Sequence, residues 1–195
     1  TVEQLLAMIP PDRNSFQIMQ AATILNANGV IAYPTEAVWG LGCSPFSESA
    51  VEQILTMKRR RRGMGLILIA KDIEQFQPFL TDISSQELDE LQESWPGPQT
   101  WLVPNNNVAP LWITGGRLTL ALRVTDHPVA AALCAEFDGP LVSTSANPHG
   151  LPPAKSKLKL NSYFRTQLDY VVPGMLGKSS NPTSIKHLQT GAVLR

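Results

Sequence analysis

Hydrophobic positions near the start of the chain recur at the spacing of an α-helix, at Ile18, Met19, Ala22 and Leu25. This period predicts a helix that turns those four side chains inward. Ser15 is a typical N-cap residue, and the pair Asn28-Gly29 is a typical stop signal. We therefore expect a helix between these two signals, followed by a buried strand over residues 30–33.

The stretch after this strand changes from apolar to polar. Pro34, Thr35 and Glu36 follow the apolar run, and Gly40 and Gly42 come shortly after them. Proline, polar residues and glycines at the carboxyl end of a buried strand are typical of a functional loop. We expect residues 34–42 to form a binding loop.

A basic run follows the next expected helix. Ser47 can cap that helix, whose apolar positions run to about Met57, and Lys58 and four arginines occupy residues 58–62. Clustered guanidinium groups suit phosphate or carboxylate oxygens. The group bound near the loop is therefore expected to be anionic.

The remaining pattern predicts further strands and helices in irregular alternation. A continuous apolar run over residues 66–70 predicts a central strand covered on both faces. The spacing of Ser84 and Glu87 predicts a capping box at the start of a helix. The other expected elements are strands at 100–103 and 118–124 around a loop over 104–116, a helix over 127–139 and a strand beginning at 141–143. This alternation predicts a twisted, mixed, open α/β sheet with helices packed on it.

A second polar strand end resembles the first. Ser143 to Asn147 carry hydroxyls and an amide directly after an apolar run. In the same way, the hydroxyl of Thr35 comes shortly after the apolar run at 30–33. Open α/β sheets bind ligands beyond the carboxyl ends of their strands, so we expect both segments to share one concave cleft. Lys58, Arg60 and Arg123 would give this cleft a positive charge.

Composition limits the classes of function. The 195 residues, 43% hydrophobic and 16% charged, suit one domain over 1–195. A formal net charge of +0 argues against a polycation that coats nucleic acid. Cys43 and Cys134 lack metal-site spacing and are expected to be reduced core thiols. No apolar run approaches the roughly 18–20 residues that cross a bilayer and no signal-peptide pattern is found, so we expect a cytoplasmic protein.

Four motifs in a fixed order resemble the YrdC/Sua5 family, most of all its short, TsaC-type form without the C-terminal Sua5 domain. They are Tyr-Pro-Thr-Glu-Ala-Val-Trp-Gly-Leu-Gly at 33–42, Lys-x-Arg at 58–60, Ala-Leu-Arg-Val-Thr-Asp-His-Pro at 121–128 and Ser-Thr-Ser-Ala-Asn at 143–147. The resemblance implies a YrdC-like fold and a threonylcarbamoyl-AMP synthase. Such an enzyme makes L-threonylcarbamoyladenylate and pyrophosphate from L-threonine, bicarbonate and ATP, for t6A37 modification of tRNAs that read ANN codons. Downstream threonylcarbamoyl-transfer proteins are the implied partners.

The same resemblance implies roles for individual residues, and makes Lys58 and Arg60 catalytic. The implied ATP-binding residues are Lys58, Arg60, Thr119, Ser145, Asn147 and Arg195. The implied threonine-binding residues are Thr35, Arg123, Ser143 and Thr183. Mg²⁺ would be held mainly by the nucleotide, because no dedicated carboxylate cluster is seen. The chain departs from the family pattern at Ala37, Arg61 and Met64, of which the last two lie in the segment expected to cover the nucleotide.

The implied chemistry needs no covalent nucleophile on the protein. A carbamate formed from threonine can itself attack the α-phosphorus, which leaves the protein to align anions and neutralise charge. One alternative is a double-stranded RNA or tRNA-binding module without catalysis, whose binding would fall steeply with salt. A second alternative keeps the fold but uses carbamoyl adenylate, as in a related domain of hydrogenase maturation proteins.

Overall fold

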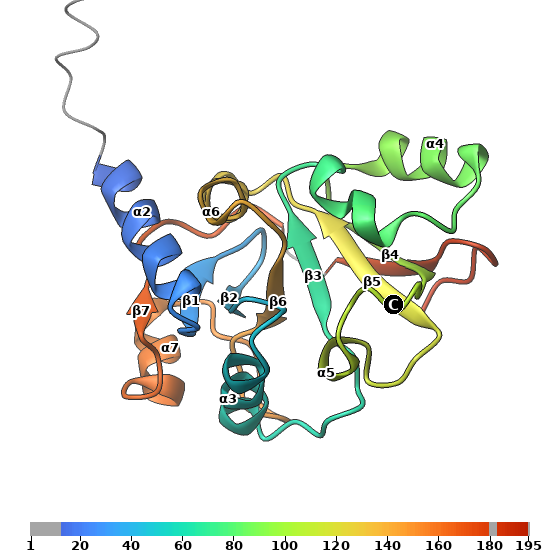
Figure 1. Ribbon diagram of the computed structural model, residues 1–195. Coiled ribbons are helices and arrows are strands. Elements are labelled where there is room, and N and C mark those ends of the chain that lie inside the picture. The colour runs from blue at the N-terminus through green and yellow to red at the C-terminus, as the bar shows by residue number, and fades with distance from the viewer. Residues whose placement is uncertain (1–12, 180–182, 195) are drawn as a thin grey trace, which may run out of the picture.

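The computed structural model describes residues 13–179 and 183–194, which are arranged around one eight-stranded sheet (Figure 1). Its strands lie in the order β7-β1-β2-β6-β3-β5-β4-β8. In chain order they are β1 (Ile31–Pro34), β2 (Trp39–Gly42), β3 (Ile67–Ala70), β4 (Gln99–Pro104), β5 (Thr119–Val124), β6 (Leu141–Ser145), β7 (Tyr170–Val171) and β8 (Ser184–His187). Strands β1 and β7, β3 and β5, and β4 and β8 pair in parallel, and the other neighbours are antiparallel. The predicted mixed, open α/β sheet is confirmed.

Helices cover both faces of this sheet. They are α2 (Arg13–Asn26), α3 (Glu48–Lys58), η1 (Glu74–Phe79), α4 (Ser85–Ser94), α5 (Leu111–Thr114), α6 (Pro128–Phe137) and α7 (Lys157–Phe164). Within the described ranges, every helix is too short or too polar to cross a membrane.

Two hydrophobic clusters divide the sheet into its two faces. The larger one includes Leu68 and Leu122 and packs against α3, η1, α4, α5 and α7. The smaller one includes Tyr33 and Ile69, and among the described helices it packs against α2 and α6. Because α2 and α6 lie over the β1, β6 and β3 part of their face, neither helix covers the β5, β4 and β8 part of that face within residues 13–179 and 183–194 (Figure 1).

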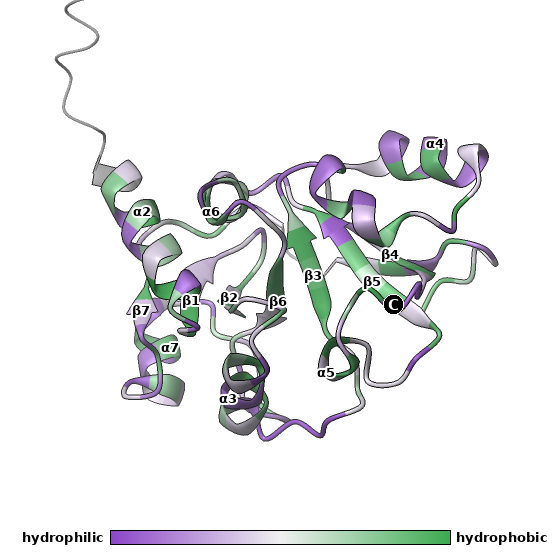
Figure 2. Ribbon diagram, in the orientation of Figure 1, coloured by the Kyte–Doolittle hydropathy of each residue, from purple (hydrophilic) through white to green (hydrophobic). Residues whose placement is uncertain are grey.

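The predicted central strand and both helix caps are confirmed. Strand β3 lies between β6 and β5, and Figure 2 shows it hydrophobic along its length, as a strand covered on both faces requires. The Ser47 hydroxyl accepts from the Ala50 amide at the start of α3. Ser84 and Glu87 form both halves of a capping box at the start of α4.

The first helix buries Ile18, Ala22 and Leu25 as predicted, but it differs from its prediction at its start and at Met19. Helix α2 already includes Arg13, so Ser15 lies inside it and does not cap it. Met19 is 51% exposed, whereas Ala21 is buried. A helix that contacts the sheet and α6 buries positions three and four residues from Ile18, and Met19 lies outside that stripe.

The expected binding loop over 34–42 is largely a β-hairpin, and a short helix interrupts a second expected loop. Strand β2 pairs with β1 in the register Tyr33 to Gly40, so that only residues 35–38 form a turn. The local sequence pattern does not predict β2, because a strand that contains two glycines gains its stability from the strands on either side. Helix α5 occupies part of the expected loop over 104–116 and contacts α3 and β5.

Candidate functional site

A cavity of about 440 Å³ lies on the part of this sheet face that α2 and α6 leave uncovered. Its floor is formed by alternate residues of neighbouring strands, including Ser143 and Ser145 of β6 and Thr119, Ala121 and Arg123 of β5. The two polar strand ends share this cavity, as expected, but the cavity is not limited to the space beyond the strand ends. The cavity lies across the sheet because the helices on this face cover only one side of it.

Most of the sequence-predicted site residues line this cavity. Those that do are Thr35, Arg60, Thr119, Arg123, Ser143, Ser145 and Thr183. Lys58 and Asn147 lie beside it and are not among the lining residues. Arg195 lies outside the described residues, so its predicted contact stays a prediction.

Lys58 fastens the end of α3 to the segment that follows β6. Its Nζ donates to the carbonyl oxygen of Ser145, to that of Asn147 at 2.9 Å and to Asn147 Oδ1 at 3.3 Å. The Ser145 hydroxyl also donates to Asn147 Oδ1 at 2.7 Å, so it can only accept a hydrogen bond from a ligand. Burial, and to a lesser degree the charge of Arg60, lowers the pKa of Lys58 to about 8. Lys58 thus shapes the cavity wall that carries Ser145.

Arg60 and Arg117 bring two positive charges to one part of the cavity. Arg60 donates from Nη2 to the Gly65 carbonyl at 2.7 Å. Its buried Nε has no hydrogen-bond partner among the residues that the structure describes. Burial and the charge of Arg117 together lower the pKa of Arg60. Among the described lining residues, three arginines stand against the single carboxylate of Glu36, which gives a net charge of +2. A cavity with this charge suits an anionic ligand.

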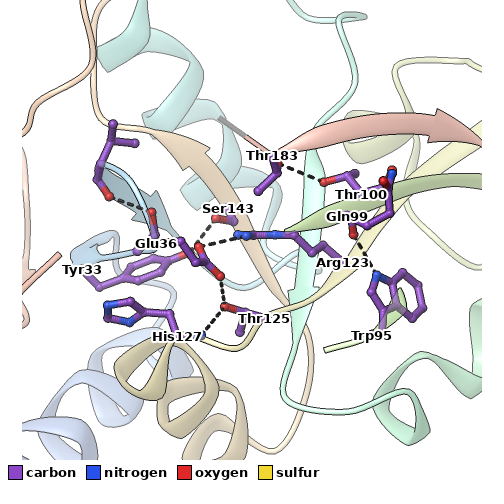
Figure 3. A network of polar contacts seen from close by, with 12 residues as sticks. Tyr33, Glu36, Trp95, Gln99, Thr100, Arg123, Thr125, His127, Ser143 and Thr183 are labelled. Atoms are coloured by element: carbon purple, nitrogen blue, oxygen red, sulfur yellow. Dashed lines mark hydrogen bonds and ion pairs between the residues drawn. The ribbon is translucent and has the colours of Figure 1, made fainter. Parts of the chain in front are cut away.

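Glu36 and Arg123 form a buried ion pair at another part of the same cavity (Figure 3). Arg123 Nη1 lies 2.9 Å from Glu36 Oε2, and the Thr125 hydroxyl donates to Glu36 Oε1 at 2.6 Å. Burial by itself would raise the pKa of the Glu36 carboxyl. The Arg123 charge and the Thr125 hydrogen bond outweigh burial and lower this pKa. Arg123 therefore keeps a guanidinium at the cavity that an anionic group can share.

A chain segment over residues 173–179 packs against the turn that carries Thr35 and Glu36. The Gly177 amide donates to the Thr35 carbonyl at 2.9 Å, and the Ser179 amide donates to the Glu36 carbonyl at 3.1 Å. His127, which precedes α6, contacts the Met175 carbonyl through Nε2 at 3.1 Å. These contacts hold the turn in place beside the cavity.

Sequence reasoning missed the contributions of Arg117, Glu36 and Thr125. Arg117 follows the glycine pair at 115–116 and comes just before β5. This position is the only local feature that could have indicated a role at the cavity. Glu36 and Thr125 belong to the matched motifs, but their partnership joins residues 89 positions apart and depends on tertiary contact.

No metal site is formed within the described ranges. There, no three His, Cys, Asp or Glu side chains come close enough together to hold an ion.

Comparison with protein families and curated sequences finds similarity over nearly the whole chain. The family model Sua5_yciO_yrdC, described as telomere recombination, matches residues 23–195. A protein of Cellvibrio japonicus named threonylcarbamoyl-AMP synthase is 52% identical over 179 residues, which cover 92% of this chain and 95% of that relative.

Solved structures share the same architecture. P. abyssi Sua5 complexed with L-threonine matches with a TM-score of 0.86 at 28% identity, over 92% of this chain and 54% of the Sua5 chain. The chain therefore spans about half the length of that Sua5 protein. E. coli YciO matches with a TM-score of 0.80 at 26% identity, over 91% of this chain and 87% of YciO.

Proposed function

Because the chain belongs to the Sua5/YciO/YrdC family, we propose that it is a threonylcarbamoyl-AMP synthase. It converts L-threonine, bicarbonate and ATP into L-threonylcarbamoyladenylate and pyrophosphate. The product serves the t6A37 modification of tRNAs that read ANN codons.

The observation that carries this proposal is one cavity with positive charge at two separate groups. Arg60 and Arg117 form one group, and Arg123 with its partner Glu36 forms the other. The reaction brings together two anions, the triphosphate of ATP and the carboxylate of threonine. A volume of about 440 Å³ lies within the usual range for sites that enclose small ligands.

We assign threonine to the Arg123 side of the cavity and the nucleotide to the Arg60 side. Thr35, Arg123, Ser143 and Thr183 would contact threonine, as the sequence predicts. Arg60, Thr119 and Ser145 would contact the nucleotide. The contacts of Lys58 with the Ser145 and Asn147 carbonyls support a role in holding this wall, in addition to its predicted contact with ATP.

The reaction then proceeds by direct attack of the substrate. The threonine nitrogen attacks the bicarbonate carbon, and water leaves as the carbamate forms. A carbamate oxygen then attacks the α-phosphorus of ATP while pyrophosphate leaves. The protein aligns the two reactants and neutralises the charge that grows on the phosphoryl oxygens. Arg60 is suited to that task because its guanidinium cannot lose its proton under ordinary conditions.

A magnesium ion fits this site only as a companion of ATP. Glu36 is the one carboxylate among the described lining residues, and Arg123 and Thr125 already engage it. The expected Mg²⁺ would be held by phosphate oxygens and water.

Other expectations from the sequence stay proposals. They are a single domain over residues 1–195, transfer of the product to downstream threonylcarbamoyl-transfer proteins, a contact with tRNA or double-stranded RNA, and work in the cytoplasm. The continuous sheet that joins residues 31–34 to 184–187 supports the first of them.

The assay that tests the function follows pyrophosphate release with threonine present, omitted or replaced by serine. We expect release to require threonine and bicarbonate. Release that ignores threonine would refute the assignment. Binding of duplex RNA without any turnover of ATP would favour the RNA-binding alternative instead.

Two variants test the assigned residues. Lys58→Ala and Arg60→Ala should remain folded and lose roughly ten- to a thousandfold in kcat, the typical loss of a preorganised donor. Arg165→Ala, which removes an exposed arginine next to the end of α7, is the matched control and should keep wild-type turnover. Circular dichroism of each variant separates loss of chemistry from loss of fold.

A further inference from the structure

Tyr33 reaches across a neighbouring strand to touch a residue of the cavity (Figure 3). Its side chain is fully buried, and its hydroxyl lies 2.8 Å from Ser143 Oγ. Tyr33 belongs to β1 and Ser143 to β6, and β2 lies between these two strands. The contact therefore depends on a ring that lies flat over β2.

Two glycines of β2 make this path available. A Cβ atom at Gly42 would come within 2.8 Å of Tyr33 Cε1, and one at Gly40 would come within 3.4 Å of Tyr33 Cζ. Any other residue at Gly42 would push the ring away from the sheet. The two glycines of the Trp-Gly-Leu-Gly strand thus provide room for the ring that ends at Ser143.

The chemistry of the two hydroxyls sets the direction of their hydrogen bond. A phenol is a far stronger acid than an alkyl hydroxyl, so it is the better donor of the pair. Burial raises the pKa of Tyr33 further, so the phenol keeps its proton at every physiological pH. Tyr33 donates and the Ser143 oxygen accepts.

This bond leaves the Ser143 proton for the cavity. Ser143 lines the cavity, and its hydroxyl donates to no acceptor in residues 13–179 and 183–194. Figure 3 shows the Glu36–Arg123 ion pair beside this contact. Ser143 and Arg123 thus present a hydroxyl proton and a guanidinium to the same part of the cavity.

We propose that Tyr33 is a positioning residue that makes the Ser143 hydroxyl a fixed hydrogen-bond donor to the carboxylate of L-threonine. The inference rests on the proposed function, because it takes threonine as the ligand beside Arg123. Tyr33 itself touches no ligand in this scheme and acts only through Ser143.

Removal of the Ser143 hydroxyl should weaken threonine binding more than removal of the Tyr33 hydroxyl. Ser143→Ala removes a donor to a charged group and should weaken threonine binding about 10- to 100-fold. Tyr33→Phe keeps the ring but frees the Ser143 hydroxyl to rotate, which should weaken binding about 3- to 10-fold. The KM for ATP should change little in Tyr33→Phe, because the nucleotide lies on the Arg60 side.

The experiment is a double-mutant cycle measured by calorimetric binding of L-threonine to the full chain. If Tyr33 acts through Ser143, the double variant Tyr33→Phe/Ser143→Ala should bind no more weakly than Ser143→Ala alone. L-Threoninamide, which lacks the carboxylate charge, should lose much less affinity than L-threonine in Tyr33→Phe. Tyr170→Phe, which removes a tyrosine hydroxyl in β7 away from the cavity, is the matched control.

Three results would overturn the inference. They are an unchanged threonine affinity in Tyr33→Phe, a double variant weaker than Ser143→Ala by the full Tyr33→Phe factor, and equal losses for threonine and its amide. Thermal unfolding checks that each variant folds. If Tyr33→Phe does not fold, 4-aminophenylalanine at position 33 restores a donor and should restore wild-type binding; a folded protein with that residue and a weakened affinity would also count against the inference.

The same measurements separate this inference from the proposed function. If the wild-type chain neither binds threonine nor releases pyrophosphate in response to it, the proposed function fails. If the wild-type chain does both while Tyr33→Phe behaves like wild type, only the role of Tyr33 fails.

Discussion

At the scale of single residues, the Glu36–Arg123 pair is a buried ion pair at the cavity to which we assign threonine. The two side chains are 11% and 6% exposed, so each would be costly to bury without the other. Thr125 occupies one oxygen of Glu36, and Arg123 faces the other. The pair therefore fixes the direction of the guanidinium that we assign to threonine.

Glu36→Gln should reduce both stability and threonine affinity. The amide keeps an acceptor for Thr125 but leaves the buried Arg123 charge uncompensated, which should lower the free energy of unfolding by about 1–3 kcal/mol. Urea unfolding at pH 7 measures the loss. Glu90→Gln, an exposed glutamate on α4, is the control and should stay within about 0.5 kcal/mol of wild type.

The pH dependence of this stability has a defined sign. The pKa of Glu36 in the folded protein lies below its ordinary value of 4.5, so the folded state favours the charged carboxylate. Its contribution to stability is therefore fully present above about pH 4.5 and is lost as the pH falls from there through the lowered pKa. The stability of Glu36→Gln should fall less steeply in this acid range. Parallel acid unfolding curves for the two proteins would contradict the assignment.

At the scale of elements, the site depends on the contact between the β1–β2 hairpin and the segment over 173–179. The turn of the hairpin carries Thr35 and Glu36, and the segment binds both of their carbonyl oxygens. Gly177 makes this approach close, because a Cβ there would lie 2.7 Å from the Glu36 carbonyl oxygen. Only glycine fits at this position without a shift of the backbone.

Gly177→Ala should therefore displace the segment or the turn. We expect a loss of about 1–3 kcal/mol in the free energy of unfolding, typical of overpacking. We also expect roughly tenfold lower kcat/KM for threonine, since Glu36 would move with the turn. Gly139→Ala is the matched control, because a Cβ there meets nothing closer than 3.8 Å. Equal effects of the two alanines on threonine kinetics would show that the segment does not position the turn.

At the scale of the whole molecule, the fold divides its work between the two faces of one sheet. One face is buried under five helical segments and forms the larger hydrophobic cluster. The other face is half covered by α2 and α6 and half open as the cavity. A ligand bound in the open half would contact β6, β3, β5 and β8 on the same face, and so would connect the strands at the centre of the sheet with the strand at its edge.

Substrates should accordingly stabilise the protein against heat. A ligand at about 100 times its Kd contributes about 2.7 kcal/mol to the stability of the folded state. For a chain of this size that corresponds to a rise in Tm of roughly 5–10 °C. Differential scanning fluorimetry with L-threonine and ATP measures the shift, and D-threonine at the same concentration is the control. An equal shift with D-threonine would argue against a specific threonine site.

Local features of the fold were predictable because they depend on neighbours in sequence. The caps at Ser47 and Ser84 were predicted correctly, and the strand expected at 66–70 is β3 at 67–70, since side chains within three or four residues set these features. Strand β2 and the exposure of Met19 on α2 were not predicted, because both depend on packing against elements distant in sequence. Helix α5 and the extension of the cavity across the sheet were not predicted for the same reason.

The sequence by itself determined the residue types of the site and the family to which they point, because motifs such as Lys58-x-Arg60 and Ser143 to Asn147 are contiguous in the chain. Tertiary structure alone decided which of those residues line the cavity and which hold the lining residues in place. It turned Lys58 toward two carbonyl groups, paired Glu36 with Arg123 and brought Tyr33 to Ser143. Each of these contacts joins residues more than 80 positions apart, and only the packing of strands and helices can bring such residues together.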